Sequence, residues 1–130
     1  MLIGNNPLNE KPEWFKKNIE ISPQTKHVEV ENKKIKYFIW GDESLPKLIF
    51  LHGFNAHSYW WSHIAPFFNA KYCVVALDFS GMGESEHREE YSQAMYSKEI
   101  KAVVDEMECT KPICLAVSYT HLRAHETLLD

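Results

Sequence analysis

The sequence lacks the features that mark several functional classes. Among its 130 residues, no apolar run approaches the roughly 20 that a membrane-spanning helix needs. The first ten residues are polar and lack the apolar core of a signal peptide. Lys and Arg form no cluster longer than a pair, and the net charge is −4. The sequence therefore predicts no membrane span and no nucleic-acid partner, which would need a basic surface.

Cysteine is also scarce. Cys73, Cys109 and Cys114 are an odd number of thiols without the spacing of a metal site. Cys73 and Cys114 fall in predicted buried strands, where a free thiol behaves as a small apolar side chain. We therefore expect a reduced, cytoplasmic protein with no metal site and no cofactor.

Short apolar runs dominate what is present. Three of them contain no polar residue, which is typical of parallel strands covered on both faces of a sheet. Two earlier runs alternate between apolar and polar residues across a short turn and predict a hairpin with one face buried. A polar lead-in, residues 1–26, precedes them. The alternating runs are His27–Val30 and Ile35–Trp40, and the apolar runs are Leu48–Leu51, Cys73–Leu77 and Ile113–Ala116.

Two helical segments separate the apolar runs. Ser58–Phe68 carries aromatic and aliphatic residues at helical spacing, and Pro66 should shorten its last turn. Ser92 is a suitable N-cap for a helix that reaches about Met107. The fold class is therefore α/β, with a hairpin, parallel strands and crossover helices on both faces of the sheet.

Two glycine-bearing motifs directly follow apolar strands. The first is His52-Gly53-Phe54, where glycine lets the backbone turn sharply and we expect His52 to hold the loop by a hydrogen bond. The second is Asp78-x-x-Gly81-x-Gly83-x-Ser85, where Asp78 and Ser85 are expected to bond backbone amides. This second motif lacks the Lys of a P-loop and has one glycine too few for a dinucleotide-binding fingerprint.

In this order and spacing, the two motifs resemble the α/β-hydrolase family, in its esterase-like serine hydrolase branch. The resemblance covers about residues 27–116 and implies the N-terminal half of an eight-stranded, mostly parallel sheet. It implies a hydrolase that acts on an ester or similar acyl bond of a small-molecule substrate by a serine nucleophile. By the same resemblance, the backbone N–H of Phe54, beside Gly53, would donate to an oxyanion.

Two alternatives remain open within this fold. Epoxide hydrolases and haloalkane dehalogenases usually carry Pro where this chain has Asn55, and their nucleophile is an Asp. Asn55 therefore favours a serine nucleophile over that type. A non-catalytic ligand-binding protein on the same fold is the other alternative.

The end of the sequence departs from the family pattern. After a strand such as Ile113–Ala116 the family places Gly-x-Ser-x-Gly, whose small residues permit the nucleophile turn. Here Ser118 lies between Val117 and Tyr119 without a flanking glycine. Residues 117–127 match a translated sequencing-library adapter, so we expect 117–130 to be a non-native tail after a truncated hydrolase domain at 27–116. The chain as given should be inactive, because nucleophile, acid and catalytic His are missing.

Overall fold

A five-stranded mixed sheet forms the centre of the computed structural model, which describes residues 11–53, 55–109 and 113–116. The strand order is β1-β2-β4-β3-β5. The first two pairings are antiparallel, and β3 runs parallel to both β4 and β5. The predicted α/β class with a hairpin and an incomplete parallel sheet is confirmed. The strands are β1 (Gln24–Val30), β2 (Lys33–Trp40), β3 (Lys47–Leu51), β4 (Cys73–Leu77) and β5 (Ile113–Ala116).

The hairpin differs from its prediction in one respect. Its turn residues Glu31 and Asn32 have φ values of 47° and 67°, which suit a tight two-residue connection. However, β2 is buried on both faces from Ile35 to Trp40, although the alternating sequence predicted one exposed face. The reason is that alternate residues of β2 pack in two apolar clusters on opposite faces of the sheet: Ile35, Tyr37 and Ile39 in one, Phe38 and Trp40 in the other. As a result Lys36 is buried.

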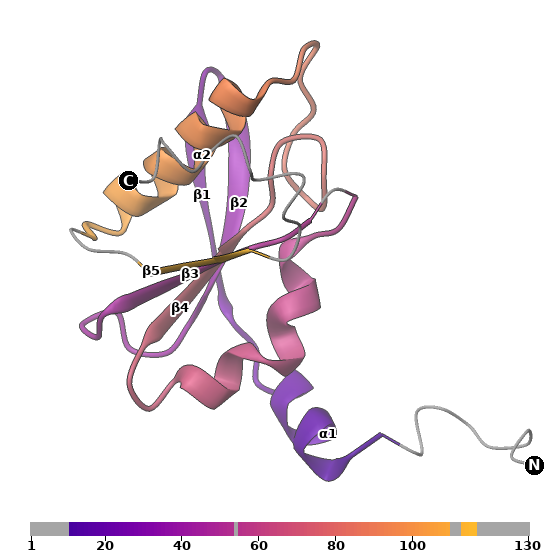
Figure 1. Ribbon diagram of the computed structural model, residues 1–130, viewed down its shortest axis with the longest axis vertical. Coiled ribbons are helices and arrows are strands. Elements are labelled where there is room, and N and C mark those ends of the chain that lie inside the picture. Colours follow the sequence, from indigo (N-terminus) through magenta and orange to yellow (C-terminus); the bar gives the residue numbers. More distant parts are fainter. Residues whose placement is uncertain (1–10, 54, 110–112, 117–130) are drawn as a thin grey trace, which may run out of the picture.

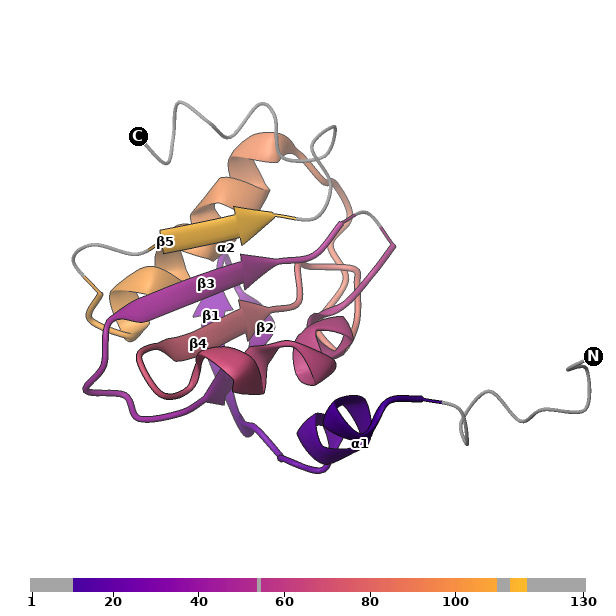
Figure 2. The same ribbon diagram turned by 60° about the horizontal axis from the view of Figure 1, so that its bottom comes forward.

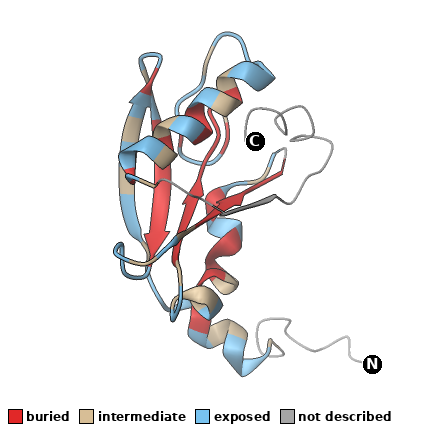
Figure 3. Cartoon of the chain, turned by 60° about the vertical axis from the view of Figure 1, so that its left-hand side comes forward, coloured by how far each residue is buried: buried red, intermediate tan, exposed pale blue. Residues whose placement is uncertain are grey.

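The sheet is covered on both faces, as predicted. Helix α2 (Gln93–Glu106) lies on one side, and the 3₁₀ helices η2 (Ser58–His63) and η3 (Ala65–Phe68) lie on the other (Figure 1). Each side has its own apolar cluster: Ile49 packs in the cluster under α2, and Phe50 packs in the one under η2 and η3. Figure 3 shows that buried residues concentrate in the strands between these layers.

The two helical segments match their predictions unequally. Ser92 caps α2 as expected, because its Oγ accepts a hydrogen bond from the amide of Met95 at 3.0 Å. The segment 58–68 forms two 3₁₀ helices rather than one α-helix, since Pro66 has no amide hydrogen for a longer ladder. Hydrogen bonds between residues three apart replace that ladder: Ile64 N donates to Trp61 O and Phe67 N donates to Ile64 O, each at 3.0 Å.

The lead-in contains helix α1 (Glu13–Ile19), which lies beside the 3₁₀ helices and outside the sheet layers (Figure 2). Asn18 Nδ2 donates to His63 O at 2.9 Å, and the rings of Trp14 and Phe67 lie 5.2 Å apart. These contacts attach the lead-in to the body of the protein. Across the described ranges, every helix is too short or too polar to cross a membrane.

Candidate functional site

Both predicted motifs lie at the same edge of the sheet. Because β3, β4 and β5 are parallel, their carboxyl ends meet there, and Figure 2 shows the connecting loops gathered at that end. His52 directly follows β3, and Asp78 directly follows β4. The predicted oxyanion donor at Phe54 and every position after Ala116 lie outside the described residues.

His52 holds the first loop with both of its ring nitrogens. Nε2 accepts a hydrogen bond from the amide of Phe79 at 3.1 Å. Nδ1 therefore carries the ring hydrogen and donates it to the carbonyl of Gly53, 2.7 Å away. The ring is buried and packs edge-on against Phe79. This arrangement positions the loop, and it does not present His52 as a general base.

The carboxylate of Asp78 binds the first residue of η2 and a residue of its own glycine loop. Oδ1 accepts from the amide of Ser58 at 2.6 Å, and Oδ2 accepts from the amide of Glu84 at 2.9 Å. The ammonium of Lys36 lies 3.0 Å from Oδ2. Complete burial alone would raise the pKa of Asp78, but the amides of Glu84 and Ser58 and the Lys36 ammonium outweigh it. The pKa therefore lies below its ordinary value.

Lys36 is the site residue that sequence reasoning missed. Its Nζ lies 3.0 Å from Ser58 Oγ and 3.4 Å from Glu84 Oε1, and it sits over the ring of Phe38. The backbone is engaged as well, since Lys36 N donates to Ser85 Oγ at 2.9 Å and Lys36 O accepts from Asp78 N at 2.9 Å. The signal in the sequence was a single lysine inside the otherwise hydrophobic run 35–40.

The glycine loop needs its glycines. Gly83 has a φ of 55°, and a Cβ there would overlap the carboxylate of Asp78. Gly81 has a φ of 78°, and a Cβ there would meet the hydroxyl of Tyr91. Ser85 Oγ donates to the Asp78 carbonyl at 2.6 Å and closes the loop. The glycine loop thus packs against the Asp78 carboxylate at Gly83, where a side chain would not fit.

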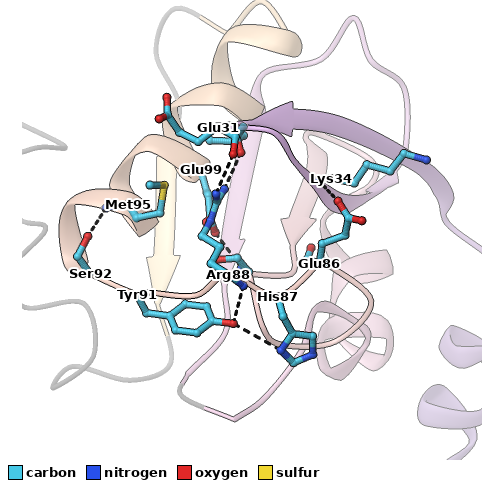
Figure 4. A network of polar contacts seen from close by, with 12 residues as sticks. Glu31, Lys34, Glu86, His87, Arg88, Tyr91, Ser92, Met95 and Glu99 are labelled. Carbon is cyan, nitrogen blue, oxygen red and sulfur yellow. Dashed lines mark hydrogen bonds and ion pairs between the residues drawn. The ribbon is translucent and has the colours of Figure 1, made fainter.

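A second buried ion pair, between Arg88 and Glu99, holds the residues that follow the glycine loop (Figure 4). Glu99 of α2 is fully buried, and it accepts from the amide of Ser80 at 2.8 Å and from Arg88 Nε at 3.0 Å. Arg88 Nη2 also donates to the carbonyl of Val30 at 2.7 Å. The hairpin turn, α2 and the segment after β4 are joined here, a network that the sequence did not indicate.

A surface cavity of ≈ 460 Å³ opens between the two loops. Lys36, Phe38, Tyr59, Asp78 and Glu84 are among the residues that line it. Its two buried charges, Lys36 and Asp78, are paired with each other, so neither is left unpaired to bind an ion. Within the part of the chain that the structure describes, no three His, Cys, Asp or Glu side chains are grouped to hold a metal ion.

Comparison with known proteins decides the family. The family model described as alpha/beta hydrolase fold matches residues 46–119, a span that begins before β3 and includes both loops, α2 and β5. The chain belongs to the α/β hydrolase fold family. This confirms the resemblance drawn from the two motifs.

This chain aligns with only part of the length of each relative. Epoxide hydrolase 4 of Mus musculus is 33% identical over 85 residues, which are 63% of this chain and 24% of that protein. Epoxide hydrolase VrEH1 from Vigna radiata is 28% identical with a TM-score of 0.68, over 78% of this chain and 33% of that one. A thioesterase domain from the curacin biosynthetic pathway has a TM-score of 0.75 at 24% identity, over 83% and 40%. The chain thus spans about a quarter of the length of its mouse relative.

Proposed function

We propose that this chain is the N-terminal part of a longer hydrolase that opens epoxides. The observation that carries the proposal is the 33% identity to an epoxide hydrolase of mouse. The position of the two loops supports it, because both emerge where β3, β4 and β5 end, the usual place for a site in this kind of sheet.

The proposed reaction proceeds through a covalent ester. A carboxylate supplied by the longer protein attacks an epoxide carbon, the carbon–oxygen bond breaks, and the released alkoxide takes up a proton. Water then hydrolyses the ester through a tetrahedral oxyanion. We assign the amide of Phe54, which follows Gly53, as one donor to that oxyanion; a donor of this kind lowers the barrier by roughly 3–4 kcal/mol. His52 and Asp78 hold the neighbouring backbone.

Hydrolysis of an ester by a serine nucleophile is the second candidate. Asn55 favours it, because its φ of 63° lies in the left-handed region that proline, fixed near −65°, cannot adopt. The loop here therefore differs in backbone conformation from the proline-containing loop usual in epoxide hydrolases. The serine route would use the same oxyanion donor through an acyl-enzyme.

One experiment separates these candidates. The longer reading frame that contains residues 1–116 is expressed, purified and assayed with styrene oxide and with p-nitrophenyl acetate. Formation of the diol supports the epoxide hydrolase, and release of p-nitrophenol without diol supports the serine hydrolase. Binding of either compound without turnover would replace both with a non-catalytic binding protein.

We further propose that the 130-residue chain is itself inactive, because the sequence directly after Ala116 does not carry the Gly-x-Ser-x-Gly motif of a nucleophile turn. The same two assays should show no turnover above buffer. Turnover that Ser118→Ala abolishes would contradict this. Independently, the DNA codons for residues 117–127 should match the adapter; codons that differ from it would remove the argument for truncation.

A further inference from the structure

The segment from His52 to Ser58 is fixed at its two ends by two consecutive residues. At the first end, the amide of Phe79 donates to His52 Nε2 at 3.1 Å. At the second end, the amide of Ser58 donates to Asp78 Oδ1 at 2.6 Å. Asp78 and Phe79 follow β4, the strand next to β3. The path of this segment therefore depends on where Asp78 is held.

Asp78 is held from the hairpin by Lys36. The ammonium contacts Asp78 Oδ2 and Ser58 Oγ at 3.0 Å each, so it spans the carboxylate and the residue that the carboxylate binds. A third acceptor, Glu84 Oε1, lies 3.4 Å away on the glycine loop. One cation thus contacts both loops at the carboxyl edge of the sheet.

Stability alone does not explain a lysine at this position. The Lys36 side chain is 3% exposed, and a buried ion pair is often no more stabilising than apolar residues of the same volume. Its neighbours in the strand are apolar, and methionine would fill the same space over Phe38. The distinctive property of lysine here is a charge that fixes the spacing of Ser58 and Asp78.

We infer that Lys36 is a positioning residue of the hydrolase: its ammonium ties Ser58 to Asp78 and so holds the segment after β3 in place at the carboxyl edge. The catalytic part of this inference rests on the proposed function, because that segment contains the amide proposed as an oxyanion donor. The inference adds a residue from the antiparallel hairpin, which neither glycine motif includes.

Amide hydrogen exchange in the 130-residue chain tests the positioning. Lys36→Met should increase exchange at Ser58 and Glu84 by about tenfold, while Ile49 in β3 changes less than about twofold. The control is Lys34→Met, on the same face of the same strand but exposed, which should change none of these amides. Unchanged exchange at Ser58, or an equal increase at Ile49, would overturn the inference.

A second variant keeps the test valid if Lys36→Met leaves too little folded protein. Lys36→Met with Asp78→Asn removes both charges, so no unpaired carboxylate is buried, and Asn keeps an acceptor for the Ser58 amide. The increase in exchange over the wild type is again expected to be larger at Ser58 than at Ile49, because the ammonium that contacted both Ser58 Oγ and residue 78 is gone. Wild-type exchange at Ser58 in this variant would refute the role of the ammonium.

Catalysis provides the readout that a purely structural role would not change. In the longer reading frame, Lys36→Met should lower kcat by about tenfold or more with KM within about twofold, since misplaced groups affect the transition state most. Lys34→Met should leave both constants unchanged. Equal losses in kcat for both variants would contradict the inference. A wild-type protein that hydrolyses neither probe would defeat the proposed function, and the exchange experiment would still decide the positioning.

Discussion

At the scale of single residues, Asp78 connects three parts of the molecule through one carboxylate. It binds the first amide of η2, an amide of the glycine loop and the ammonium of Lys36. Burying a carboxylate is costly unless it is paired and hydrogen-bonded, and here every contact favours the ionised form. Removing one of the two charges alone would leave the other buried and unpaired, which is strongly destabilising.

Acid should weaken the fold through Asp78. The pKa of Asp78 is lower in the folded chain than in the unfolded chain. Its contribution to the free energy of unfolding is therefore fully present above the unfolded pKa of about 3.9, and it is lost as pH falls through the folded pKa. We expect Asp78→Asn to be less stable than wild type at neutral pH and to lose less on acidification. Urea unfolding between about pH 6 and 3 measures this. The exposed control Asp105→Asn should follow the wild-type curve; parallel curves for Asp78→Asn would refute the prediction.

A side chain at Gly83 should also weaken the fold. We expect Gly83→Ala to destabilise it by about 2–4 kcal/mol, because the methyl group both overlaps the Asp78 carboxylate and strains a positive φ. Asn32→Ala is the matched control: its φ is 67° but the side chain is exposed, so it should lose only about 1 kcal/mol. Equal losses in denaturant unfolding would mean that the contact with Asp78 contributes nothing.

At the scale of elements, the sequence predicted those whose signals are local. The apolar runs of β3 and β4 indicated buried parallel strands, and Ser92 marked the start of α2. The 3₁₀ form of η2 and η3 was missed, because apolar spacing does not distinguish a 3₁₀ helix from a short α-helix beside a proline. The burial of Lys36 was missed because the partners of its ammonium are distant in the sequence: Ser58, for example, lies 22 residues away, beyond any local pattern.

The helix cap supplies the prediction at this scale. Ser92→Ala should cost about 1 kcal/mol, because the amide of Met95 loses its side-chain acceptor. Ser92→Asn keeps an acceptor and should stay close to wild type. Thermal unfolding followed by circular dichroism compares the three proteins. An alanine variant as stable as the asparagine variant would show that the cap does not stabilise α2.

At the scale of the whole molecule, the described sheet ends unequally at its two sides. The β1 side ends in a hairpin whose exposed residues include charged side chains. On the other side β5 pairs with β3 and, within the described ranges, with no other strand. Its sequence is entirely apolar. Unpaired apolar strand edges promote association between chains.

We therefore expect the 130-residue chain to associate as its concentration rises. Sedimentation velocity should show a mass above 15.2 kDa that increases with concentration. A charged residue at the edge, Leu115→Lys, should reduce the association, and Lys34→Glu on the hairpin side should not. A concentration-independent monomer mass for the wild type would contradict this.

The long-range contacts of Lys36 also constrain the order in which the chain can fold. During synthesis the β1–β2 hairpin leaves the ribosome early, but Ser58 and Ser85, which Lys36 contacts, follow 22 and 49 residues later. Until Ser58 and Asp78 have been synthesised, the ammonium lacks the partners that it has in the folded chain, and burying it would be costly. Because Asp78 directly follows β4, we expect burial of the cation to accompany the docking of β4 on the hairpin. Closing such long loops is slow. We therefore expect the hairpin to become an interior part of the sheet only after the glycine loop has been synthesised.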